Sequence, residues 1–395
     1  MWGFCKLQFM RAVLFFLFAC CSICAEKPLA VYLTWIDNPL TTIEVMWLTT
    51  NADCGQLTWN GQTIEALHKN LPQLPATLHQ VSLKGLTPGE KYSFSLEDEK
   101  YQFSMPRPEL PCHFIVGGDC YHDEKEIYFK MLRTIAEKKP DFVVFGGDLA
   151  YSVQKKAGPE HPERWITFLS GLTDYMKKGD ELIPVLTAIG NHELLGGYGQ
   201  TPEKASLYYS LFPGNGFRKL QFDHYLNLFI LDSGHTHEIA GAQTEWLKKA
   251  LENPSNIPYS FAVYHVPAFP TVRPYTYSYS KEIRKNWVPL FETFKLTAAF
   301  EHHDHTLKRT FPILNKDAVK TGGVVYFGDG TCGVGDPRVP KEVGTVWYLA
   351  YSKQAQAVWD VTLTKEKAFF QALSADGTIL DKTEISPSLG KSTTP

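Results

Sequence analysis

The chain lacks several features that would assign it to a simple class. It has 395 residues with 39 basic and 42 acidic side chains, a net charge of −3, and no long run of one sign. Nucleic-acid-binding surfaces are usually basic, so we expect no nucleic-acid partner. Internal repeats and low-complexity stretches are also missing, which excludes a repeat architecture. The composition favours a globular protein with a small substrate.

Cysteine is scarce and irregularly spaced. Four of the eight cysteines lie within the first 25 residues, and the others are Cys54, Cys112, Cys120 and Cys332. These four form no CxxC pair and no dense framework, which excludes a small disulfide-stabilised fold. At most two disulfides can form among them, the pairing stays open, and Cys120 can remain a free thiol. Cysteine therefore does not carry the function.

Only one apolar run approaches membrane-spanning length, and it lies at the N-terminus. Lys6 and Arg11 precede residues 12–25, and the polar Glu26 follows. This layout predicts a secretory signal peptide over residues 1–25. The alternatives are an uncleaved anchor and a lipoprotein anchor, the latter because of Cys20, Cys21 and Cys24. We expect a protein that is secreted, periplasmic or at the cell surface, without a transmembrane helix after cleavage, and the oligomeric state stays open.

Two patterns follow each other along the chain. From 29 to 106, short alternating segments separated by turn formers predict an antiparallel β-sandwich, which we expect to pack rather than to catalyse. Residues 105–111 form a linker. From 112 to 385, strand-like and helix-like segments alternate, which predicts an α/β domain. Residues 386–395 predict a disordered tail.

Polar residues with ligand chemistry stand at the ends of five predicted strands. They are Asp119, Asp148, Asn191, His265 and His303, which follow "FIVGG", "FVVFGG", "LTAIG", "FAVY" and "LTAAFEH". Ligands of open α/β sheets bind at the carboxyl ends of the strands. Any one of these residues alone could be a turn or packing residue. Their joint occurrence favours a metal centre for Fe, Zn or Mn, which take oxygen and nitrogen donors.

These residues belong to five ordered motifs: "GGDC" at 117–120, "GDLAY" at 147–151, "GNHE" at 190–193, "AVYH" at 262–265 and "HHDH" at 302–305. The set resembles the metallophosphoesterase superfamily, and "GDLAY" has the GDxxY form of the purple acid phosphatases. The preceding sandwich is similar to the fibronectin type III-like domain of plant-type members. The resemblance covers residues 29–385 and implies a two-sheet αββα catalytic domain.

The resemblance also implies a dinuclear site. Its first metal would take Asp119, Asp148, Tyr151 and His305, and its second Asp148, Asn191, His265 and His303. A phenolate suits ferric iron, so the resemblance implies Fe(III) beside Zn, Fe or Mn. The implied reaction is phosphomonoester hydrolysis by a metal-bound hydroxide. His192 would contact the phosphate or act as general acid, or else only orient Asn191. Glu193 would support the ligands, and Arg309 would lie near the last one.

The chain departs from the family pattern at three points. Tyr121 replaces the glycine of the first motif, so its loop must accommodate a bulky residue or expose it at the site. His302 replaces the glycine of the fifth motif. The segment after His265 lacks the histidines that plant-type members use for substrate, and Arg273 or Tyr275 are either their replacements, Arg273 as a phosphate clamp, or ordinary loop residues.

The stretch "EHHDH", residues 301–305, packs three histidines and two carboxylates together. Alternation along an extended segment places His303 and His305 on one side. His302 and Asp304 then point away, and Glu301 is the least constrained. We therefore predict that His302→Gly is tolerated far better than His303→Ala or His305→Ala.

Three further features receive weaker assignments. The pair His235 and His237 in "SGHTHE" has no partner motif, so we expect it at the surface or the rim of the site. The glycine-rich residues 328–336 lack the Lys-Ser/Thr of a P-loop and predict a rim or tight turns. His122 either faces the site or has a surface or capping role, and we expect the latter.

Two other functions compete with a phosphomonoesterase. The same metal site could serve a phosphodiesterase or a nucleotide hydrolase. A binding protein at the cell surface, with a recognising sandwich and an inert metal domain, is the remote alternative. The complete set of seven ligands argues against it.

Overall fold

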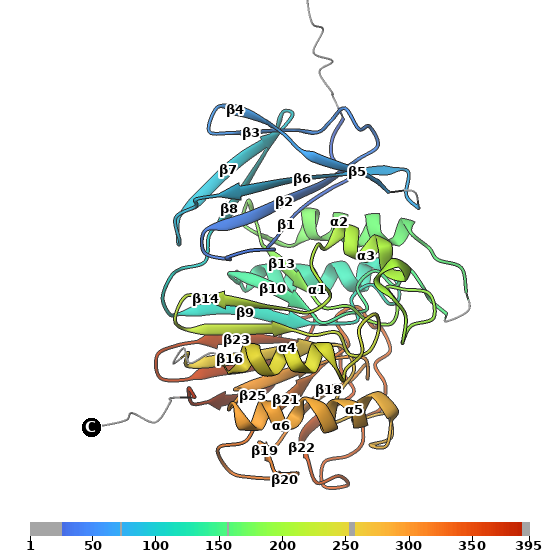
Figure 1. The fold of residues 1–395 in the computed structure, drawn as a ribbon, viewed down its shortest axis with the longest axis vertical. Helices are drawn as coiled ribbons and strands as arrows, with labels where there is room; N and C mark the ends of the chain where they lie inside the picture. Colours follow the sequence, from blue (N-terminus) through green and yellow to red (C-terminus); the bar gives the residue numbers. More distant parts are fainter. Residues whose placement is uncertain (1–25, 72, 156–157, 253–256, 389–395) are drawn as a thin grey trace, which may run out of the picture.

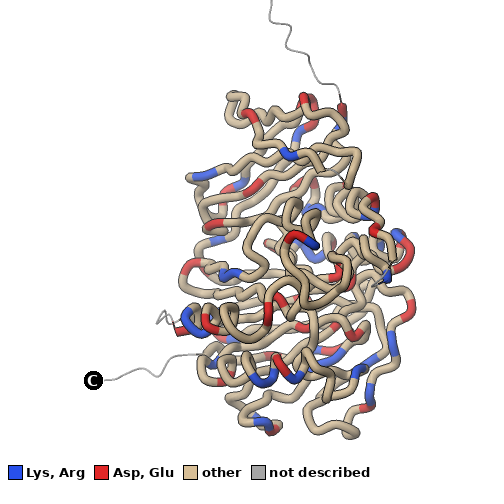
Figure 2. Tube along the Cα trace, turned by 45° about the vertical axis from the view of Figure 1, so that its right-hand side comes forward, with Lys and Arg blue, Asp and Glu red and all other residues tan. Residues whose placement is uncertain are grey.

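The computed structural model describes residues 26–71, 73–155, 158–252 and 257–388 (Figure 1). The predicted signal peptide, with its alternative anchors, and residues 389–395 of the predicted tail lie outside the described residues. Over the described ranges, none of the helices has the length and apolar character needed to cross a membrane. Acidic and basic residues are intermixed along the trace, and neither sign is confined to one part of it (Figure 2).

The N-terminal unit consists of antiparallel strands in two sheets. The first sheet has the order β1-β2-β6-β5, with bounds Ala30–Thr34, Thr42–Thr49, Ala76–Lys84 and Leu67–Leu71. In the second, β8-β7-β3-β4 span Glu99–Ser104, Lys91–Leu96, Gln56–Trp59 and Gln62–Glu65. Alternating side chains such as Trp47, Phe94 and Phe103 fill the space between the sheets. The predicted antiparallel sandwich is therefore present.

The second sheet does not stop at this unit. A hairpin of β11 (Lys177–Lys178) and β12 (Glu181–Leu182) extends it, with Glu181 opposite Gln102 on β8. The Glu181 carboxylate also accepts a hydrogen bond from Ser104 Oγ at 2.5 Å. Thr173 adds a second link, because its hydroxyl bonds both the N–H and the carbonyl of Val31. The two units thus share a sheet, and the domain bounds at 106 and 112 stay a prediction.

The second unit contains one six-stranded sheet and one seven-stranded sheet. The first has the order β13-β10-β9-β23-β24-β25, with bounds Val185–Thr187, Phe142–Phe145, Cys112–Gly117, Val358–Leu363, Ala368–Leu373 and Ile379–Ile385. The second has the order β14-β15-β16-β17-β21-β18-β22, with bounds Arg218–Phe222, Leu226–Ile230, Tyr259–Tyr264, Ala298–Glu301, Val325–Gly328, Leu307–Thr310 and Leu349–Lys353. The strands that precede the predicted ligands run parallel within each sheet. A short pair, β19 (Ile313–Leu314) and β20 (Asp317–Ala318), lies apart.

Helices cover the outer faces of both sheets (Figure 1). Against the first sheet lie α1 (Lys125–Glu137) and α2 (Glu163–Tyr175), with η1 (Pro202–Ala205) and α3 (Ser206–Leu211) nearby. Against the second lie α4 (Ala242–Leu251), α5 (Ser278–Asn286) and α6 (Val288–Thr293). Aromatic rings join the inner faces, as between Phe114 and Phe261 at 5.8 Å. This order of layers confirms the predicted α/β class with a helix–sheet–sheet–helix arrangement.

Candidate metal centre

The seven predicted ligands all follow the carboxyl ends of strands. Asp119 follows β9, Asp148 and Tyr151 follow β10, and Asn191 follows β13, all in the first sheet. From the second sheet, His265 follows β16, and His303 and His305 follow β17. Because the sheets pack face to face, these two edges open at the same place. The fold thus explains why residues so far apart in sequence meet.

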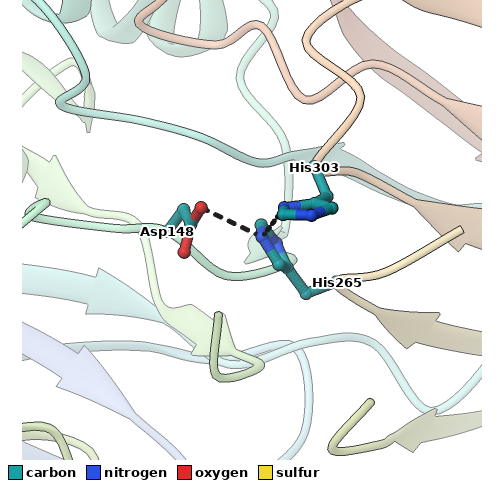
Figure 3. A group of neighbouring side chains, drawn as sticks. All are labelled: Asp148, His265 and His303. Carbon is teal, nitrogen blue, oxygen red and sulfur yellow. Dashed lines mark hydrogen bonds and ion pairs between the residues drawn. The ribbon is translucent and has the colours of Figure 1, made fainter. Parts of the chain in front are cut away.

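Two groups of potential ligand atoms form around one shared carboxylate. Asp119, Asp148 and His305 form the first group, and Asp148, His265 and His303 form the second, with ligand atoms within 4.8 Å of one another in each. Figure 3 shows the second group, in which His265 lies between the other two side chains. His265 Nε2 is 3.0 Å from Asp148 Oδ2 and 3.0 Å from His303 Nδ1. Asp148 is thus placed to bridge two ions.

Tyr151 and Asn191 adjoin these groups. The Tyr151 hydroxyl donates to Asp119 Oδ1 at 2.7 Å and lies 3.1 Å from His305 Nε2. Asn191 Oδ1 accepts a hydrogen bond from Tyr198, whose hydroxyl also contacts His303 Nε2. Tyr151 therefore lies beside the first group and Asn191 beside the second.

Five of the seven predicted ligands have left-handed backbone conformations. The φ angles are 55° at Asp119, 52° at Asp148, 51° at Tyr151, 65° at His303 and 54° at His305. Such conformations cost roughly 1–3 kcal/mol each for a residue other than glycine. Strain concentrated on these residues indicates that the loops are shaped for a site and not for packing.

The charges in the two groups of ligand atoms suit the binding of cations. Burial would raise the pKa of Asp119 and Asp148, but the nearby imidazoles outweigh burial and lower both values. Burial would likewise lower the pKa of His265, but the carboxylates of Asp148 and Asp119 raise it to about 9. The fully buried Asp148 Oδ2 has no aligned hydrogen-bond donor. Buried carboxylates and imidazoles are a suitable donor set for two metal ions.

Glu193 and Arg164 hold the ligand loops in place. The Glu193 carboxylate accepts hydrogen bonds from the N–H groups of Asp148, Leu149 and Gly190 at 2.7–2.8 Å. Burial and the nearby Asp148 raise the pKa of Glu193 to about 8. Arg164 Nε donates to the Ala150 carbonyl at 2.8 Å. Glu193 thus ties the backbone of the Asp148 loop to that of the loop before Asn191.

The first-motif Tyr121 does not join the ligand groups. The Arg164 guanidinium lies 3.8 Å above its ring, and the ring stacks on Tyr128 of α1 at 6.3 Å. Tyr121 therefore points toward the helical layer. The loop of the first motif accommodates Tyr121 because the ring packs toward α1 and not into the site.

Two histidines flank Tyr151 at the mouth of the site. His192 stacks on the Tyr151 ring at 4.3 Å, its Nδ1 is 2.5 Å from the Val153 carbonyl, and its Nε2 is 3.9 Å from Asp148 Oδ2. The ring of His122 lies 4.9 Å from both Tyr151 and His305. The side chain of His122 is 33% exposed and borders two candidate ligands, in agreement with the alternative that it faces the site.

The other members of "EHHDH" are more constrained than predicted. His302 does point away from the ligand groups, but its Nδ1 is 2.5 Å from the buried Asp329 carboxylate. Glu301, predicted to be the least constrained, is buried, accepts hydrogen bonds from Tyr264 Oη and Ala268 N at 2.8 and 2.7 Å, and pairs with the buried Lys308. The predicted direction of His302 is right, but β17 ends at Glu301 and the φ angles of His303 and His305 are positive, so alternation along an extended segment is not its cause. The sequence also did not reveal these buried partners.

The predicted substrate residues have other partners. Arg309 forms a two-pronged ion pair with Asp381 at 2.7 and 3.1 Å, so its predicted place beside the last ligand is wrong. Arg309 lies within β18, and its partner Asp381 lies on β25. Arg273 binds Asp304 Oδ1 and the His303 carbonyl, both at 2.7 Å. The ring of Tyr275 lies under the Arg284 guanidinium at 3.6 Å.

The "SGHTHE" segment lies beside the predicted ligands and is not an ordinary surface loop. Asp232 caps it by accepting hydrogen bonds from four backbone N–H groups, those of residues 234–237. His235 is buried, and its ring is 5.6 Å from that of His265. His237 is partly exposed. The expectation of a surface or rim position therefore holds for His237 and is wrong for His235.

The glycine-rich residues 328–336 border the ligands, as expected of a rim. At Gly330, φ is +53°, and an added Cβ would lie 2.8 Å from His303 N and 2.9 Å from Asp119 Oδ2. Only glycine leaves room for the ligand loops at this point.

Comparison with known proteins places this geometry in a family. Residues 112–307 match the family model described as calcineurin-like phosphoesterase. No curated protein sequence matches the chain. Because the family match contains all seven predicted ligands, it covers the whole candidate centre.

Solved structures with the same fold have little sequence identity to the chain. The purple acid phosphatase PPD1 from yellow lupin (Lupinus luteus) seeds has a TM-score of 0.74 at 15% identity, covering 91% of this chain and 74% of that one. PhoD has a TM-score of 0.65 at 14% identity, covering 91% and 90%. GAP50, described as the anchor in the inner membrane complex of Plasmodium, has a TM-score of 0.52 at 14% identity, covering 72% and 91%. The chain thus carries a calcineurin-like phosphoesterase domain, and with it the fold of the metal-dependent phosphoesterases.

Proposed function

We propose that the protein is an exported phosphatase that hydrolyses small phosphomonoesters at a dinuclear metal centre. The observation that carries the proposal is the shared Asp148, which belongs to two buried groups of ligand atoms at once. A bridging carboxylate with separate ligands on each side is the arrangement that two adjacent ions require. Tyr151, beside the first group, supports Fe(III) there, and the amide and imidazoles of the second group suit Zn, Fe or Mn.

The charge of the loaded centre fits an anionic substrate. A trivalent and a divalent cation would exceed the three anionic ligands Asp119, Asp148 and Tyr151, so the centre would be net positive and attract a phosphate group. When bound, the two ions would activate water as the nucleophile and neutralise charge on the phosphoryl oxygens. The buried ligands would hold that charge away from bulk water, which strengthens its effect.

His192 is the group of this chain best placed to act on the substrate. Its Nδ1 must donate to the Val153 carbonyl at 2.5 Å, so Nε2 is the nitrogen that faces the centre. The side chain is partly exposed, and Nε2 lies 3.9 Å from Asp148 Oδ2. It would bind a phosphoryl oxygen or give a proton to the leaving oxygen.

The proposal of export is supported by the N-terminal sequence. The charged and apolar layout of residues 1–25 supports a signal peptide, with release from the cell, the periplasm or the cell surface as destinations. The two-sheet antiparallel N-terminal unit supports a fibronectin type III-like role as a rigid packing module.

Metal analysis combined with a visible spectrum tests the centre. The purified protein should contain two metal ions per chain and show a charge-transfer band that Tyr151→Phe abolishes. Asn191→Ala should abolish hydrolysis of p-nitrophenyl phosphate. Arg309→Ala, whose side chain binds Asp381 away from the centre, is the matched control and should keep full activity. A protein without bound metal, or an active Asn191→Ala variant, would refute the proposal.

A phosphodiester or nucleotide substrate is the second candidate. Arg273 is already bound to Asp304 and the His303 carbonyl, so it offers no free clamp for a doubly charged monoester. A phosphodiester carries one negative charge fewer, so its binding needs less stabilisation by a cationic side chain. Rates on p-nitrophenyl phosphate and bis-p-nitrophenyl phosphate separate the two. The remote alternative is an inert surface protein, and GAP50, a protein of similar fold, is described as an anchor. Such a protein would hydrolyse neither of these two substrates.

A further inference from the structure

We infer that Tyr198 is a positioning residue for the second metal ion, acting through Asn191 and His303. The inference rests on the proposed metal centre, because both residues are predicted ligands of that ion. The Tyr198 hydroxyl donates to Asn191 Oδ1 at 3.0 Å and lies 2.9 Å from His303 Nε2. One side chain thus contacts a ligand from each of the two sheets.

The two nitrogens of His303 face different partners. Its Nδ1 is 3.0 Å from His265 Nε2, inside the group that contains Asp148. Its Nε2 faces the Tyr198 hydroxyl. A metal in this group would therefore take the Nδ1 lone pair, and the ring proton would lie on Nε2.

This assignment fixes the direction of a chain of hydrogen bonds. The Nε2–H group of His303 donates to Tyr198 Oη, and the Tyr198 O–H group donates to Asn191 Oδ1. An amide oxygen has two lone pairs, so Asn191 Oδ1 can accept this bond and bind a metal at the same time. The hydroxyl thereby selects the correct tautomer of His303 and aims the correct atom of Asn191 at the ion.

The loop around Tyr198 is built to hold it there. It reads "GGYG", residues 196–199, and φ is 90° at Gly196, 76° at Gly197 and 63° at Gly199. Tyr198 is thus the only side chain of the loop. Its ring stacks on Tyr279 of α5 at 4.3 Å and lies 4.8 Å from the ring of His235.

The "SGHTHE" segment anchors the same loop. His235 Nδ1 donates to the Gly197 carbonyl at 2.8 Å. In return, the Gly199 N–H donates to the Gly234 carbonyl at 2.9 Å, and the Gln200 N–H donates to that of His235 at 2.8 Å. The segment that has no motif partner in the sequence thus serves to place the tyrosine.

Calorimetric titration of the metal-free protein with Zn²⁺ tests the inference. Tyr198→Phe removes only the hydroxyl and should weaken one of two binding events by about 10–100-fold, the usual effect of losing a partner of a metal ligand. The other event should keep its affinity. Tyr279→Phe removes a hydroxyl from the stacked ring and should leave both events unchanged. Urea unfolding checks that both variants fold like the parent protein.

The outcomes separate this inference from the proposed function. A parent protein that binds fewer than two Zn²⁺ ions would contradict the metal centre itself. Two events with unchanged affinities in Tyr198→Phe would leave the centre intact and refute the role of Tyr198. A double mutant adds a direct test: in the Asn191→Ala background, Tyr198→Phe should cost less affinity than in the parent. An equal loss in both backgrounds would show that Tyr198 does not act through Asn191.

Discussion

Replacing His302 with glycine should destabilise the fold by about 3–5 kcal/mol, the usual cost of breaking a buried ion pair by removing one partner. This corrects the tolerance that the family glycine predicts. The His302 side chain is only 1% exposed and lies 2.5 Å from the buried Asp329. Burial raises the pKa of Asp329, so its carboxyl takes up a proton more readily once His302 is removed, and the loss of stability should lie toward the lower end of this range.

The fit of the ring gives a second estimate of the same size. A Cβ added at Gly146 would lie 1.8 Å from His302 Cδ2, and one added at Gly118 would lie 2.5 Å from Cγ. The ring therefore fills the space that these glycines leave, and its removal opens a cavity. Truncating a buried ring typically costs about 3–5 kcal/mol. The two estimates describe one event and are not additive.

Urea unfolding at neutral pH, with metal content measured on the same samples, is the assay. His302→Gly should lose stability and still bind two ions, whereas His303→Ala should lose the second ion at a smaller cost in stability. Adding Gly146→Ala to His302→Gly should recover part of the loss, because the methyl group fills the vacated space. A His302→Gly protein within about 1 kcal/mol of the parent would refute the reasoning, since it would match an ordinary surface substitution.

Three further perturbations have defined outcomes. Burial lowers the pKa of His79 to about 4, so the neutral imidazole contributes its full stabilisation above pH 6.5 and this contribution is lost as the pH falls toward 4. Unfolding at several pH values should show that the unfolding free energy falls by at most about 3 kcal/mol over this range. His79→Gln should reduce this fall. Gly330→Ala should prevent metal binding, because the methyl group would lie 2.8 Å from His303 N, and metal analysis checks this. Lys91→Met breaks an exposed ion pair with Glu181 and should change the unfolding free energy by less than about 1 kcal/mol.

Much of the centre was predictable because its ligands obey a topological rule. Parallel strands carry their ligands at one edge, so Asp119, Asp148 and His265 could be assigned to a common site from the apolar runs before them. The division of the ligands between two ions was implied by the resemblance to the metallophosphoesterases. The structure then brought the same residues together.

The supporting residues could not be predicted, because local pattern does not reveal partners across the fold. The sequence indicated that His302 points away from the ligands, but it did not reveal the partner Asp329, which comes from another loop. Arg309 follows the last ligand closely in sequence, yet its partner Asp381 lies on β25. Tyr198 stands alone between glycines, which signals a turn and nothing about chemistry.

The hairpin β11–β12 that continues the sandwich sheet makes the two units one mechanical body. A hinge between them would have to break main-chain pairing at Glu181 and the bonds between Thr173 and Val31. The sandwich therefore cannot swing away from the centre while these bonds are intact. A molecule bound to the sandwich would therefore hold the metal centre in a fixed orientation.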